Sequence, residues 1–201
     1  MARIPGVSPD EAGPELAGTI GYAREMMAQI GGRATARGAE PVEVLAHAPE
    51  LLRGVLALSG AAAEANRVPD RLKHLASLKA ATLINCEYCI DLASQVSRRA
   101  GLSDEVLLAL PGYRTSPLVT ELERLVLDYA VGMSRTPVDV SDELFARLRE
   151  HFDPAQIVEL TNAIVLENLY SRCNHALGIG AAGFSEGMVC AVPERAPAPV
   201  G

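Results

Sequence analysis

An almost uncharged segment near the middle of the chain limits the folds that are open to it. The stretch LASLKAATLI (residues 75–84) carries a single charge, on Lys79, and Val68, Pro69 and Asp70 precede it as a helix start. These features predict a helix over residues 70–83. A helix that is apolar on all sides is usually buried in the centre of a protein. We therefore expect other helices to surround this one.

Pro and Gly residues divide the remainder of the chain into further helical segments. Apolar residues at three- and four-residue spacing, together with capping patterns, predict helices at 14–30, from 49, at 86–100, from 103, from 116, at 141–152 and at 153–176. We find no strand-type alternation, and a core rich in Ala with few aromatic residues favours close helix packing. The predicted fold class is all-α, a multi-helix bundle. We expect one domain over residues 1–201, with a flexible Pro-rich tail from about residue 192.

The charge of the chain argues against one class of partner. A formal net charge of −7 at pH 7 disfavours nucleic acid, because phosphates require clustered Lys and Arg. No apolar run approaches the roughly 20 residues of a membrane span. The N-terminal residues have no apolar stretch behind Arg3, so we expect a cytoplasmic protein without a signal peptide or a membrane partner.

Two cysteines three residues apart are the strongest chemical signal in the chain. Cys86 and Cys89 fall at the predicted start of a helix, with Asn85 as the expected N-cap. A first-turn thiol lies near unpaired backbone N–H groups and the positive end of the helix dipole, and both favour the thiolate. The residues alone are compatible with a redox-active pair, with inert packing, or with half of a metal site.

A metal site would need further ligands, for which Cys173 and His175 are the natural candidates. Two residues apart on a helix, their side chains point about 200° from each other, so they are poorly placed to bind one ion together. A structural zinc site usually has a second close-spaced pair, which this sequence lacks. Cys190 also has no close-spaced partner. We therefore disfavour metal.

The context of the cysteine pair resembles a known family. The stretch RLKHLASLKAATLINCEYCIDLASQVSRRAGLSDE (residues 71–105) is similar to the alkyl hydroperoxidase D-like branch of the carboxymuconolactone decarboxylase superfamily. The similarity extends less specifically through LERLVLDYAVGMSRTP and VELTNAIVLENLYSRCNHALGI. The shared signature is an apolar helix, then Cys-x-Tyr-Cys, then a helix that ends in an AGLS-type turn.

The resemblance implies a fold, an activity and roles for the two cysteines. It implies an alkyl hydroperoxidase D-like helical bundle that forms a homo-oligomer and reduces hydroperoxides with thiols. It implies that Cys89 attacks the peroxide and that Cys86 resolves the product as a disulfide, with a cellular dithiol or reductase protein restoring the pair. No bound cofactor is required. The residues themselves do not order the two thiols, although a thiol nearer the helix start is usually the more exposed one, here Cys86.

The chain departs from the family pattern at two positions. The family has a glutamate twelve residues before the first cysteine and a histidine four residues after the second, where this chain has His74 and Ala93. We consider His74 as a catalytic acid–base group, because its ordinary pKa near 6.5 allows it to accept a thiol proton at neutral pH. The alternative is a core histidine with satisfied ring nitrogens. Ala93 has no proton chemistry.

Other polar residues near the motif have both a functional and a structural interpretation. Lys79 is a candidate for binding an anionic substrate, or its stem lies on apolar surface while its ammonium reaches water or a carboxylate. Tyr88 is a candidate for a hydrogen bond to a peroxide oxygen, or it packs. Polar groups on the last long helix, Glu167, Asn168 and His175, either line a pocket or pair across an interface.

We predict a thiol peroxidase that cycles between dithiol and disulfide. One alternative is a carboxymuconolactone decarboxylase-like enzyme that does not use the dithiol. The other is a non-catalytic oligomer whose dithiol senses redox state, which the loss of the two relay residues favours.

Overall fold

The chain is helical throughout the part that the structure describes. A computed structural model describes residues 2–194 of the 201 residues. Its helices are α1 (Pro14–Gly31), α2 (Glu40–Leu45), α3 (Pro49–Glu64), α4 (Asp70–Ile84), α5 (Glu87–Arg99), α6 (Asp104–Ala109), α7 (Glu121–Ser134), α8 (Asp142–His151) and α9 (Pro154–Leu177), with a short 3-10 helix η1 (Leu110–Gly112) after α6. No strand occurs in residues 2–194. The all-α prediction is confirmed.

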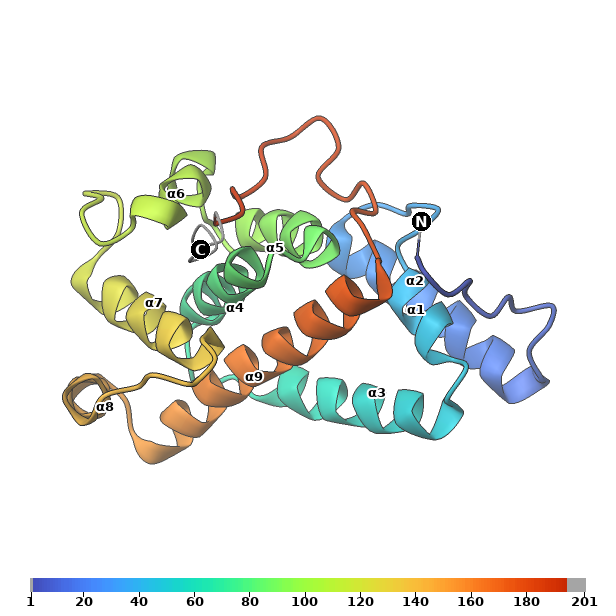
Figure 1. Cartoon of the computed structure of the whole chain (residues 1–201), viewed down its shortest axis with the longest axis horizontal. Helices are drawn as coiled ribbons and strands as arrows, with labels where there is room; N and C mark the ends of the chain where they lie inside the picture. Colours follow the sequence, from blue (N-terminus) through green and yellow to red (C-terminus); the bar gives the residue numbers. More distant parts are fainter. Residues whose placement is uncertain (1, 195–201) are drawn as a thin grey trace, which may run out of the picture.

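Helix α4 lies at the centre of the molecule, as its apolar sequence predicts. It packs against α5, α7 and α9, which surround it in Figure 1. Residues on several sides of α4 are buried, from Leu72 to Thr82. One side contributes Leu75 and Leu78 to a core that includes both cysteines of the motif. Another side contributes Leu72 and Ala76 to a second core with α7, α8 and α9.

Capping patterns fix the starts of the long helices. At α9 the expected box forms, with Gln156 N–H donating to Asp153 and Asp153 N–H donating to Gln156, both at 2.9 Å. At α7 the predicted start at Ser116 is wrong by several residues. Thr120 and Glu123 form a capping box there, and this reciprocal pair of hydrogen bonds starts the helix at Glu121.

The segment after α9 returns over α5 and α4. In Figure 1 it leaves the end of α9, arches over the molecule and descends beside α5. Ala191 N–H donates to Ser94 Oγ at 3.0 Å, and Glu194 N–H donates to the Thr82 carbonyl at 3.0 Å. Residues 195–201, which make up most of the predicted flexible tail, lie outside the described residues. None of the helices described is long and apolar enough to cross a membrane.

Candidate dithiol site

The turn between α4 and α5 places both cysteines at the start of α5. Asn85 ends α4 in the left-handed conformation, with φ 60° and ψ 44°, which Asn adopts more readily than most residues. Cys86 follows as the N-cap of α5. The expectation that Asn85 caps α5 is wrong, because the backbone of Asn85 terminates α4 and the Cys86 side chain takes the capping role.

The Cys86 sulfur is the stabilised anion of the pair. Cys86 Sγ accepts a hydrogen bond from the Cys89 backbone N–H at 3.2 Å, at the positive end of the α5 dipole. Hydrogen bonds from the Cys89 thiol and from the Cys89 backbone lower the pKa of Cys86, although burial opposes them. The site therefore favours a thiolate at Cys86.

The Cys89 sulfur is held in its protonated form. The hydrogen bond with Cys86, in which the Cys89 thiol is the donor, raises the pKa of Cys89, and burial raises it further. Asn174 Nδ2 on α9 donates a weak hydrogen bond to Cys89 Sγ at 3.5 Å. The pKa values of two chemically identical side chains thus shift in opposite directions, because one side chain caps the helix and the other lies inside its first turn.

A polar face of α9 completes the site. Glu167, Ser171 and Asn174 are four and three residues apart, which places them on one side of the helix. Ser171 Oγ donates to Glu167 Oε1 at 2.6 Å. Burial raises the pKa of Glu167, while hydrogen bonds from Ser171 and from the Cys89 thiol, whose single proton can go either to Glu167 or to Cys86, partly counteract this effect. The carboxyl group therefore faces the two sulfurs in a poorly solvated environment.

The sequence prediction reached this face only in part. Glu167 is predicted either to line a pocket or to pair across an interface, and it lies beside the thiols. Ser171 and Asn174 were not predicted. Their spacing from Glu167 along an otherwise apolar helix is a usable signal, because a row of polar residues on one face of a buried helix requires partners.

His74 does not reach the thiols. It lies ten residues before the end of α4 at Ile84, about 15 Å along the helix axis. Burial lowers the pKa of His74, and the charged groups that act on it are Asp70 and Lys73, not the cysteines. A general base must come within hydrogen-bond reach of its proton. The prediction that His74 is catalytic is therefore corrected.

Lys79 lies in a different environment from the cysteine pair. Its side chain is 1% exposed, and Nζ donates to the Leu110 carbonyl at 3.0 Å and pairs with Glu194. The ammonium also lies 4.6 Å from the centre of the Tyr113 ring. Burial lowers the pKa of Lys79 to about 8. These contacts favour the structural interpretation, with the ammonium on a carboxylate, over substrate binding.

Tyr88 packs between elements and uses its hydroxyl for structure. The ring meets Phe184 edge to face, with centroids 5.9 Å apart. The hydroxyl donates to the Gly38 carbonyl at 2.5 Å, so its proton is already engaged. The structure favours the packing interpretation of Tyr88 over a hydrogen bond to a peroxide.

Both sulfurs lie just below the surface. Cys86 is 0% and Cys89 5% exposed, so the expectation of a more exposed Cys86 is wrong. The Cys86 side chain turns inward to cap α5, whereas its chain neighbours Asn85 and Glu87 are exposed. The turn itself is therefore open to solvent and the sulfurs beneath it are not.

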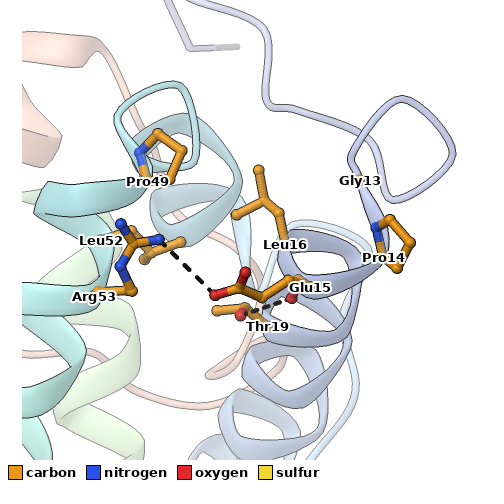
Figure 2. A pocket seen from close by; sticks show the side chains of 8 residues that line it. All are labelled: Gly13, Pro14, Glu15, Leu16, Thr19, Pro49, Leu52 and Arg53. Atoms are coloured by element: carbon orange, nitrogen blue, oxygen red, sulfur yellow. Dashed lines mark hydrogen bonds and ion pairs between the residues drawn. The ribbon is translucent and has the colours of Figure 1, made fainter.

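A cleft of about 360 Å³ lies elsewhere in the molecule. Figure 2 shows it between the first turns of α1 and α3, with Leu16 and Leu52 in its wall and Glu15 facing Arg53 at 4.0 Å. Neither cysteine of the pair lines this cleft, so it is separate from the dithiol.

Metal ligands do not converge in the described part of the chain. Residues 2–194 contain no group of three or more His, Cys, Asp or Glu side chains arranged to hold an ion. Cys173 and His175, the candidates for such a site, are both exposed on α9.

Comparisons with known proteins identify chains that are similar to this one. Residues 49–131 match the model of the carboxymuconolactone decarboxylase family. The uncharacterized protein YnjA of Escherichia coli strain K12 is 42% identical over 125 residues, which are 62% of this chain and only 65% of YnjA.

Solved structures show the same fold. ATU0492 from Agrobacterium tumefaciens, a protein of unknown function described as a putative antioxidant defence protein AhpD, is 28% identical with a TM-score of 0.64, covering 68% of this chain and 94% of that one. The debrominase Bmp8 is 19% identical with a TM-score of 0.73, covering 86% and 91% of the two chains. At this identity, the likeness to Bmp8 shows the fold alone.

Fold and site together define a helical protein with a buried dithiol at the start of a helix. Residues 49–131 match the carboxymuconolactone decarboxylase family, and the fold is the one seen in the alkyl hydroperoxidase D-like protein ATU0492. The expected family and bundle are confirmed.

Proposed function

We propose that this protein is a thiol-dependent oxidoreductase that reduces hydroperoxides through a dithiol–disulfide cycle of Cys86 and Cys89. The observation that carries this proposal is the Cys86 sulfur at the N-terminus of α5, where the Cys89 backbone and thiol both donate to it. A thiolate is the nucleophilic form of cysteine, and a second thiol within hydrogen-bond distance can resolve its oxidised product.

The cycle has three balanced steps. The Cys86 thiolate attacks the O–O bond, which gives a sulfenic acid at Cys86, and the departing alkoxide takes a proton to become an alcohol. The Cys89 thiol then attacks the Cys86 sulfur, which releases water and leaves a disulfide. An external dithiol reduces this disulfide to two thiols and is itself oxidised. The order reverses the roles that the family resemblance implies, because the hydrogen bonds of this chain stabilise the anion on Cys86 and not on Cys89.

Cysteine variants test this proposal. Cys86→Ser and Cys89→Ser each remove one member of the pair, whereas Cys173→Ser is a matched control on the exposed face of α9. With dithiothreitol as reductant, we expect either of the first two variants to lose disulfide-linked peroxide consumption, and the control to retain it. Unchanged turnover in both Cys86→Ser and Cys89→Ser would refute the assignment.

The same variants test the order of attack. In Cys89→Ser the sulfenic acid of Cys86 has no resolving thiol, so dimedone should trap it rapidly at Cys86. In Cys86→Ser the hydrogen bond with the Cys86 sulfur is gone, but burial still raises the pKa of Cys89, so trapping should be slower there. Faster trapping at Cys89 would restore the order that the family resemblance implies.

Two further parts of the proposal come from the resemblance. We propose that the chain acts as a homo-oligomer and that a cellular dithiol or reductase protein supplies its electrons. Sedimentation would then show a mass that is a multiple of 21.2 kDa, whereas a monomer would contradict the assembly.

A further inference from the structure

We infer that Glu167 is the acid–base residue of the dithiol, in place of the relay residues that this chain lacks at positions 74 and 93. The inference rests on the proposed dithiol cycle and assigns its proton transfers to a named group. The evidence is the position of Glu167 beside the Cys86–Cys89 pair and its lack of a structural partner of opposite charge.

Each buried acidic side chain of the described residues is held by a cation or by several N–H groups, whereas the half-buried Glu167 has neither. Glu123 pairs with Arg71 at 2.6 Å, Glu159 pairs with Lys73 at 3.0 Å, and the Asp91 carboxylate accepts backbone N–H groups of residues 182–185. Within residues 2–194, no Lys or Arg forms an ion pair with Glu167. Its polar partners are Ser171 and the Cys89 thiol. An enclosed carboxyl group without a cation favours its neutral form, so it can hold a proton for the reaction.

Ser171 connects Glu167 to the sulfurs. A hydroxyl has one proton to donate, and Ser171 Oγ directs it to Glu167 Oε1 at 2.6 Å. A hydrogen bond from Ser171 also lowers the pKa of both Cys86 and Cys89. Ser171 can therefore serve the carboxylate when Glu167 is ionised and the sulfurs when Glu167 carries the proton, which makes it a positioning residue.

The proton balance of the cycle closes with Glu167 as the carrier. The reduced protein starts with both thiols protonated and Glu167 ionised, and the Cys86 proton passes to Glu167 to give the Cys86 thiolate. Attack on the peroxide transfers the Glu167 proton to the alkoxide, which leaves as an alcohol. The Glu167 carboxylate then accepts the Cys89 proton as Cys89 attacks the sulfenic acid, and returns it to the departing hydroxide as water. After the external dithiol restores two thiols, the Cys86 proton passes to Glu167 and the cycle restarts.

The titratable groups that face Glu167 determine the pH dependence of thiol alkylation. They are the thiols of Cys86 and Cys89 on α5 and, on α9, Tyr170, whose hydroxyl lies 2.5 Å from Ser59 Oγ of α3. The Glu167 charge raises the pKa of both thiols. Removing that charge while keeping the shape of the side chain should therefore make the pair easier to ionise, even as it removes the proton donor.

The test uses Glu167→Gln in the full chain, in a Cys173→Ser, Cys190→Ser background so that only the pair reacts with iodoacetamide. Glu159→Gln is the matched control, a buried carboxylate two turns earlier on the same helix. We expect Glu167→Gln to slow peroxide consumption by about 100-fold, the lower end of the range for general acid–base catalysis, and to shift the pH midpoint of alkylation downward. The control should change neither.

If Glu167 had only a structural role, its replacement would not make the thiols easier to alkylate and at the same time slow peroxide consumption. Turnover at the parent rate, or an unmoved alkylation midpoint, would overturn the inference. If the parent protein consumes no peroxide, the proposed function fails, and the alkylation midpoint alone decides whether Glu167 is coupled to the pair. If Glu167→Gln does not fold, Ser171→Ala replaces it in the test. We then expect the pH midpoint of thiol alkylation to shift upward, and an unchanged midpoint would contradict the inference.

Discussion

At the residue scale, position and not residue type decides the chemistry of the site. Cys86 and Cys89 have the same side chain, yet the N-cap position gives Cys86 a backbone donor that Cys89 lacks. Glu167 and Glu159 are both enclosed acids on α9, yet only Glu159 has a cation, Lys73. The unpaired acid is the one that faces the thiols. A poorly solvated acid without a counter-charge usually lowers stability, so the presence of Glu167 here favours a functional role.

The unfavourable ionisation of Glu167 in the folded protein predicts that folding stability depends on pH. Because the folded state raises the pKa of Glu167 above its ordinary value of 4.5, the folded protein binds this proton more tightly than the unfolded chain does. The protonated Glu167 contributes fully to the free energy of unfolding at pH values below 4.5. This contribution is lost as the pH rises through the pKa of Glu167 in the folded protein. The loss is about 1.4 kcal/mol for each pH unit that separates the folded pKa from the unfolded pKa.

Urea unfolding of Glu167→Gln and the parent protein at a series of pH values measures this effect. Since Gln does not titrate, the variant should gain stability relative to the parent as pH rises above 4.5. A difference that stays constant across this range would show that ionising Glu167 carries no penalty in the folded protein.

At the element scale, one carboxylate of α5 anchors the segment that follows α9. Asp91 accepts the backbone N–H groups of Ala182, Gly183, Phe184 and Ser185 at 2.7 to 3.0 Å. Phe184 in turn packs against Tyr88 and closes tightly on Gly31 of α1, where an added Cβ would lie 2.2 Å from the ring. Asp91 thus fixes the segment after α9 on α5, and this position brings Phe184 against α1.

Removing that anchor should loosen this segment. We expect Asp91→Ala to lower the free energy of unfolding by about 2–4 kcal/mol, because several buried N–H groups lose a charged acceptor. The amides of residues 182–185 should then exchange faster with solvent. Asp142→Ala, an exposed first-turn acid of α8, is the control. Equal effects of the two substitutions would mean that the anchor contributes little.

Local patterns predicted the helices well and the site only in part. Apolar spacing and capping residues depend on neighbours a few positions apart, so α1, α4, α8 and α9 were predicted within one or two residues. The start of α7 was missed because Ser116–Pro117 and Thr120–Glu123 both resemble helix starts, and only the second forms a complete box. Ser171 and Asn174 were missed because they lie about 80 residues further along the chain, and only tertiary packing brings α9 to Cys89.

At the scale of the whole molecule, α4 makes the site possible by packing against both of its halves. α5 brings the thiols to one end of α4, and α9 brings the acid across it (Figure 1). Neither half is a site alone, because the thiols need a proton carrier and the acid needs a reacting group. The fold therefore builds a buried dithiol with its own acid from two segments that are distant in sequence.

A single-turnover reaction of the reduced protein with an equimolar hydroperoxide, followed by mass spectrometry of the Cys86–Cys89 peptide, tests the central claim most directly. The account predicts one disulfide within this peptide for each peroxide consumed, formed without any added cofactor. Recovery of both thiols in reduced form after the peroxide has been consumed, or their conversion to sulfinic acids with no disulfide, would contradict it.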